Sequence, residues 1–157
     1  MNKKILLVLS GSGTPDEAIT HAAGRAKKEG ATLVALYVLE SAQSKEAFET
    51  FTDIGFIGDK PSSDISESLM REYRQRGYEE LGRVQIKAME AGVNFEPLME
   101  EGEFISIVLD VIDRLDIGAV VLIKPKEKAS FMKYFSKSIV DTIKERAKCD
   151  VEIFVEK

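Results

Sequence analysis

Two short segments of the chain are apolar at every position and end at residues that interrupt regular structure. Residues 5–9 stop at a serine–glycine turn, and residues 119–123 lie between Gly118 and Pro125. A short run of this kind is typical of a strand that is buried on both faces, as in the middle of a parallel sheet. These two segments therefore predict the two central strands of a sheet.

The spacing of apolar residues predicts seven further elements. Three more strands are expected over residues 32–38, 93–99 and 151–155. Four helices are expected over residues 15–28, 63–91, 104–115 and 136–147. Alternating strands and helices predict a single-domain α/β protein over residues 1–157, a five-stranded parallel sheet with helices on both faces.

Three residues refine this expectation. Pro97 places its strand at a sheet edge, because proline donates no ladder hydrogen bond. Thr14 with Glu17 three residues later has the form of a capping box at the start of the first helix. Gly77, inside the long helical pattern, permits close packing or a slight bend.

Charge and cysteine content narrow the class of protein. The net charge of −5 argues against a general nucleic-acid binder, which usually carries a basic excess. Cys149 is the one cysteine, so an intrachain disulfide is excluded and a reducing cytoplasm is the expected compartment. No apolar run reaches membrane-spanning length. We expect a cytoplasmic protein that binds neither nucleic acid nor membrane.

The two central strands also predict where a ligand would bind. If they are neighbours, the strand order reverses between them, and a crevice opens at their carboxyl ends. That crevice would lie between residues 10–13 and residues 124–128.

Several segments, in register, resemble the universal stress protein family over essentially the whole chain. They are the first strand and turn KKILLVLSGS, Leu36-Tyr37-Val38, Glu101-Gly102-Glu103, Ser138-Ile139-Val140-Asp141 and the segment from Ala147 to Val151. The resemblance implies the adenine-nucleotide-hydrolase-like fold of that family.

The nucleotide motif of this family is degenerate in the chain. Nucleotide-binding members carry Gly-x2-Gly-x9-Gly followed by Ser or Thr, and the alignment puts Lys124, Glu127 and Lys137 on the three glycines, with only Ser138 retained. The acidic residue that contacts the nucleotide in the family falls on Ser10. A side chain in a left-handed conformation costs about 1–2 kcal/mol, so loss of the glycines weakens a backbone phosphate site.

The resemblance therefore predicts no cofactor, with ATP, AMP or another anion kept as an alternative. Five lysines between positions 124 and 137 could hold an anion through their side chains, or could simply form a solvated turn. The candidate crevice residues are Ser10, Gly11, Ser12, Val38, Lys124, Lys126, Glu127, Lys137 and Ser138.

No enzyme or metal site emerges from the remaining residues. His21 is the only histidine and has no recognisable base or orienting partner for a catalytic triad. One histidine and one cysteine do not make a zinc site. Cys149 is expected to be a buried small residue. The aromatic segment over residues 48–57 packs on the domain or, in a small-molecule sensor, closes over an apolar pocket.

The last strand is the candidate dimer interface. Residues 151–155 alternate apolar and acidic residues, as in a half-exposed strand at a sheet edge. The resemblance implies a homodimer in which Val151, Ile153 and Val155 face the partner or neighbouring helices. We therefore predict a non-enzymatic, dimeric stress-response or regulatory protein. The alternative is a protein that binds a nucleotide or another anion in the crevice and, in one version, hydrolyses ATP slowly.

Overall fold

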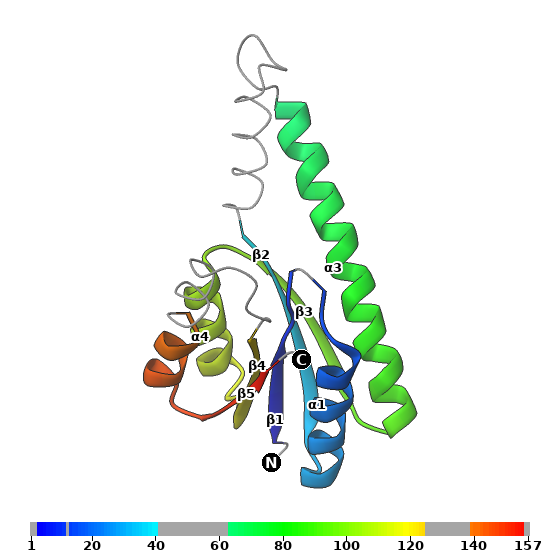
Figure 1. Cartoon of the computed structure of the whole chain (residues 1–157), viewed down its shortest axis with the longest axis vertical. Coiled ribbons are helices and arrows are strands. Elements are labelled where there is room, and N and C mark those ends of the chain that lie inside the picture. The colour runs from blue at the N-terminus through cyan, green and yellow to red at the C-terminus, as the bar shows by residue number, and fades with distance from the viewer. Residues whose placement is uncertain (1–2, 12, 41–62, 125–138, 156–157) are drawn as a thin grey trace.

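The computed structural model describes residues 3–11, 13–40, 63–124 and 139–155. In the segment 63–124, side chains are described from residue 67 onward. In this part of the chain, five strands form one sheet in the order β3-β2-β1-β4-β5 (Figure 1). All of their pairings are parallel. The strands are β1 Lys4–Val8, β2 Thr32–Leu39, β3 Phe95–Glu101, β4 Ala119–Lys124 and β5 Asp150–Val155.

As the apolar runs predicted, β1 and β4 are neighbouring inner strands of the sheet, and β2 is the third inner strand. Ile5 lies opposite Ala119, and Leu7 opposite Val121. All four side chains are buried, with at most 1% exposed. The strand order reverses between β1 and β4, so their carboxyl ends form the expected crevice.

Helices cover both faces of the sheet, which explains the continuous apolar runs in the central strands. The described helices are α1 Asp16–Glu29, α3 Ser63–Ala91, α4 Phe104–Arg114 and a further helix over residues 139–146. Residues of α1 and α3 join one buried cluster, while α4 and the helix over 139–146 join the other. The predicted five-stranded α/β fold with helices on both faces is confirmed.

The predicted capping box at α1 is wrong. The N-cap is Pro15, and no side chain of the described residues caps the helix. The hydroxyl Oγ1 of Thr14 instead accepts a hydrogen bond from the backbone N–H of Ser10 over 3.0 Å. The threonine therefore closes the turn after β1 rather than the first turn of α1.

The long helix α3 lies close to side chains of the sheet at Gly77. A Cβ at this position would lie 2.5 Å from Cε of Met99 and 2.8 Å from Cδ1 of Tyr37. The glycine thus serves close packing. From there the N-terminal turns of α3 extend well beyond the sheet, as Figure 1 shows.

The last strand, β5, is partly covered on both faces. Val151 and Ile153 pack against the cluster beneath α4, and Phe154 packs against the cluster beneath α1. Nη1 of Arg25, on α1, donates to Oε1 of Glu152 over 2.7 Å. The predicted half-exposed strand at a sheet edge is confirmed, because β5 is an edge strand and none of its residues is fully buried. The Arg25 side chain covers only part of the acidic side, where the Glu152 side chain stays 33% exposed.

Candidate functional site

A cavity of about 190 Å³ lies at the carboxyl ends of β1 and β4. The strands contribute Val8, Leu122 and Ile123 to its lining, and Leu9 follows β1 directly. The helices contribute Phe104 from the start of α4 and, from the helix over 139–146, Ile139, Val140 and Ile143. The polar or small lining residues are Ser10, Gly11 and Glu40. Among the described lining residues, eight are apolar and the only charged one is Glu40.

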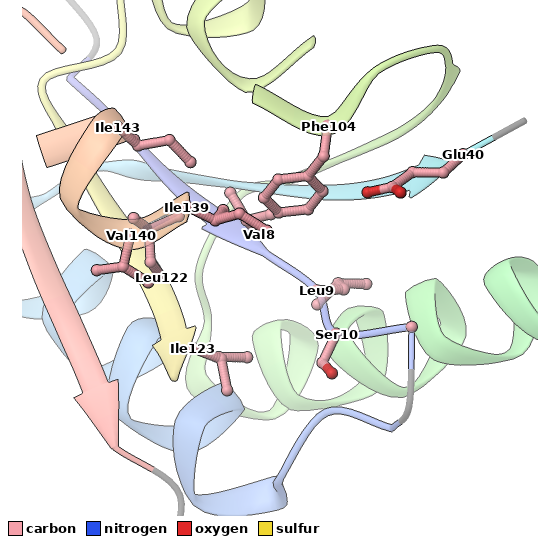
Figure 2. A pocket seen from close by; sticks show the side chains of 11 residues that line it. Val8, Leu9, Ser10, Glu40, Phe104, Leu122, Ile123, Ile139, Val140 and Ile143 are labelled. Carbon is pink, nitrogen blue, oxygen red and sulfur yellow. The ribbon is translucent and has the colours of Figure 1, made fainter. Parts of the chain in front are cut away.

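Figure 2 shows how these side chains converge. Ile139, Val140 and Ile143 lie on one side of the cavity, and the ring of Phe104 lies between Ile139 and Glu40 in this view. The carboxylate of Glu40 points from the end of β2 toward that ring. The cavity therefore has an apolar wall and, at one end, a hydrogen-bond acceptor.

The predicted site residues are only partly brought together. Ser10 and Gly11 line the cavity. Val38 is 7% exposed and belongs to the buried cluster beneath α4, and Lys124 is the half-buried last residue of β4. Neither Val38 nor Lys124 is among the described lining residues. The other predicted residues, Ser12, Lys126, Glu127, Lys137 and Ser138, and the aromatic segment over 48–57, lie outside the described part of the chain.

The turn that carries Ser10 is held by a buried polar contact with α3. The backbone N–H of Thr14 donates to Oε1 of Glu80 over 2.9 Å. Thr14 is 2% and Glu80 7% exposed. Arg83 donates through Nη1 to the other oxygen of Glu80, and through Nη2 to Oδ1 of Asp16 over 2.5 Å. Through these hydrogen bonds with Arg83, the pKa of Asp16 falls below its usual range. The contacts connect the edge of the cavity to the long helix.

The N-terminus of α4, beside the cavity, already has an acidic partner. Oε2 of Glu103 accepts from the backbone N–H of Ser106 over 2.7 Å. Hydrogen bonds from Ser106 hold the pKa of Glu103 below its ordinary value of 4.5. A helix N-terminus attracts anions through its unpaired N–H groups and its dipole. At α4, the carboxylate of Glu103 already binds one of these N–H groups.

Other chemical groups of the described residues lie away from the cavity. His21 is exposed on α1, where Nε2 lies 2.5 Å from Oε2 of Glu152. Cys149 is half-buried rather than buried, and burial raises the pKa of its thiol. In the described segments, no group of three or more His, Cys, Asp and Glu side chains could hold a metal ion. No described helix is both long and apolar enough to span a membrane.

The family model of the universal stress proteins matches residues 1–154. The chain belongs to the universal stress protein family. No curated protein sequence matches it significantly.

Solved structures of this family share the fold. A family member from Burkholderia pseudomallei is 20% identical, with a TM-score of 0.68 over 97% of this chain and 95% of that one. UspA from Lactobacillus plantarum is 19% identical, with a TM-score of 0.71 over 97% of both chains. A universal stress protein from Archaeoglobus fulgidus, solved in complex with dAMP, is 17% identical, with a TM-score of 0.58 over 96% of both chains. These similarities support the fold, which the sequence resemblance had implied.

Sequence reasoning missed most of the cavity lining. Phe104, Ile139, Val140 and Ile143 lie within the predicted helices, and nothing in their spacing separates core contacts from a cavity wall. Glu40 follows the second strand directly, and its position at a strand's carboxyl end was a usable signal.

Proposed function

We propose that this universal stress protein is a non-enzymatic, dimeric regulatory protein that does not bind ATP in the manner of the family's nucleotide-binding members. The observation that carries the proposal is the lining of the crevice between β1 and β4. Among its described residues, eight apolar side chains and the carboxylate of Glu40 line this crevice. Burial of phosphate charge beside apolar groups and a carboxylate is unfavourable unless cations compensate it.

The sequence after β4 also supports the proposal. Lys124, Glu127 and Lys137 stand where nucleotide-binding members have glycine. Glycine lets the backbone approach a phosphate and adopt positive φ without a steric penalty. The chain lacks these three glycines, so a phosphate cradle made of backbone N–H groups is disfavoured.

Of the two sheet edges, β5 is the better one for dimer formation. On the other edge, the N–H of Leu33 donates to the carbonyl of Asn94 over 2.8 Å. Backbone N–H and C=O groups point to alternate sides along a strand. The backbone groups that point away from β2 are therefore those of Phe95, Pro97 and Met99. Pro97 has no N–H and interrupts the row of donors on this edge, which discourages addition of a strand.

The edge of β5 has no proline between Asp150 and Val155. Val155 is 57% exposed, although Val151 and Ile153 already pack on the chain's own core. The proposed dimer therefore rests on the backbone of β5 and on Val155. Contacts from Val151 or Ile153 are secondary.

Nucleotide or anion binding is the second candidate. It is favoured by the dAMP complex of the relative from Archaeoglobus fulgidus and by the five lysines between positions 124 and 137. In this case lysine side chains would replace the backbone donors of the lost glycines.

An ultraviolet spectrum of freshly purified protein, followed by calorimetric titration with ATP, separates the two candidates. The chain has no Trp and four Tyr, so its own absorbance is weak and bound nucleotide would be visible near 260 nm. The Archaeoglobus fulgidus protein, titrated with dAMP, serves as the positive control. We expect no nucleotide band and no heat of binding. Micromolar ATP affinity would contradict the proposal and support the second candidate.

A further inference from the structure

We infer that the cavity at the ends of β1 and β4 is a binding site for a single-ring or similarly small apolar molecule that carries a hydrogen-bond donor and no negative charge. The inference rests on the proposed function, since it names what this crevice takes in place of a nucleotide.

The size of the cavity sets the first limit on the ligand. Its volume is about 190 Å³. Sites for drug-sized ligands are larger, about 300–1,000 Å³, whereas an engineered apolar cavity of about 150 Å³ in another protein takes up benzene. A ligand of roughly one ring fits this space.

The walls set the second limit. Val8 and Leu122 line the cavity from the strands and are each 2% exposed, so this part of the wall is apolar and shielded from water. Ile139 and Val140 face them from the helix over 139–146, and Phe104 adds an aromatic ring (Figure 2). An apolar ligand loses little on leaving water for such a site, whereas a charged group pays a large desolvation cost.

Glu40 sets the third limit, which concerns polarity. Its carboxylate points toward the Phe104 ring. A carboxylate has two oxygens and about four acceptor positions, so it can receive a donor from a ligand beside its other contacts. An anionic ligand of the same shape would be repelled by Glu40 and would find no cation among the described lining residues.

The matched pair of phenol and benzoate tests this specificity on the full-length protein. Both have one ring, but phenol offers a hydroxyl donor and benzoate a negative charge. With labelled Ile, Leu and Val methyl groups, nuclear magnetic resonance would report shifts at Leu122, Ile139 and Val140. We expect phenol to shift these methyls in a saturable way, and benzoate to bind at least about tenfold weaker, since about 1.4 kcal/mol of repulsion corresponds to tenfold.

Three variants test the location. Ile139→Phe fills the cavity from a half-buried lining position and should abolish the phenol shifts. Leu109→Phe adds the same ring at a half-buried position of α4 outside the lining, and should leave phenol binding intact. Glu40→Gln removes the charge and should narrow the difference between phenol and benzoate at least threefold.

The outcomes distinguish this inference from the proposed function when AMP is titrated in the same experiment. If neither phenol nor AMP shifts the cavity methyls, the inference is overturned and the proposed function stands. If AMP shifts them, both are overturned. Equal affinity for phenol and benzoate, or phenol binding that survives Ile139→Phe, would overturn the inference alone.

Discussion

Oε1 of Glu80 accepts a hydrogen bond from the backbone N–H of Thr14 over 2.9 Å, between residues 66 positions apart. The carboxylate thus satisfies a buried donor in the turn after β1 and also pairs with Arg83. Since the hydroxyl of Thr14 in turn receives the N–H of Ser10, the conformation of the cavity's edge depends on α3.

Glu80→Ala should lower the free energy of unfolding by about 1–3 kcal/mol, because it leaves the buried Thr14 N–H without its acceptor. Glu80→Gln keeps an acceptor oxygen, so it should lower the free energy of unfolding by less than Glu80→Ala does. Urea unfolding followed by circular dichroism measures both variants. The control is Glu79→Ala, at an exposed position where the carboxylate accepts a long hydrogen bond of 3.5 Å from Gln75. The expected change in the free energy of unfolding is within about 0.5 kcal/mol. Equal effects at positions 79 and 80 would contradict this account.

Gly77→Ala and Gly82→Ala should change stability in opposite directions. Both glycines lie inside α3, where alanine is favoured over glycine by about 1 kcal/mol. At Gly82 a Cβ meets nothing within 4 Å, so this gain should be observed. At Gly77 it would overlap Tyr37, which is 2% exposed, and the crowding should cost about 1–3 kcal/mol. Thermal unfolding of the two variants decides, and a more stable Gly77→Ala would show that this close approach is not rigid.

The capping contact of Glu103 should contribute to the free energy of unfolding in a pH-dependent way. Hydrogen bonds from Ser106 place the pKa of Glu103 below its ordinary value of 4.5, so the folded state binds this proton less readily than the unfolded state. The contribution is therefore fully present above about pH 4.5 and is lost as the pH falls through the lower, folded-state pKa. Glu103→Ala should cost about 1 kcal/mol near pH 7 and clearly less near pH 3.

The control for this prediction is Glu103→Ser, which keeps a capping oxygen without a titrating group. Its stability relative to Glu103→Ala should vary little with pH. Unfolding by urea at several pH values measures all three proteins, and a pH-independent cost of Glu103→Ala would contradict the ionic contribution.

Val155→Lys should weaken a dimer formed through the edge of β5. Val155 is 57% exposed, so lysine is tolerated in the monomer, whereas charge at a paired strand edge opposes association. Ile153→Lys is a less clean test, because Ile153 packs on the chain's own core. Ile86→Lys, at a 58% exposed position on α3, is the matched control. In sedimentation velocity we expect a dimer for wild type and Ile86→Lys, and a shift toward monomer for Val155→Lys. If Val155→Lys remains a dimer, the interface does not lie at the edge of β5.

The sequence alone predicted the five strands, showed which of them are central, and indicated the family. Residues 5–9 and 119–123 are apolar at every position, and only burial on both faces explains this pattern, so both were recognised as central. The helix over 63–91 followed from the spacing of its apolar residues in the same way. These features are local or repeat along the chain, and so they can be read from neighbouring positions.

Only the tertiary structure decided the contacts that shape the cavity. Thr14 has the local signature of a helix cap, but the N–H of Ser10 and the carboxylate of Glu80 take up its polar groups. Phe104 and Ile139 carry the signature of core residues, and a gap between them appears only when α4 and the helix over 139–146 meet the ends of β1 and β4. The physical reason is that hydrogen-bond partners and voids are set by groups far apart in sequence, which local periodicity does not record.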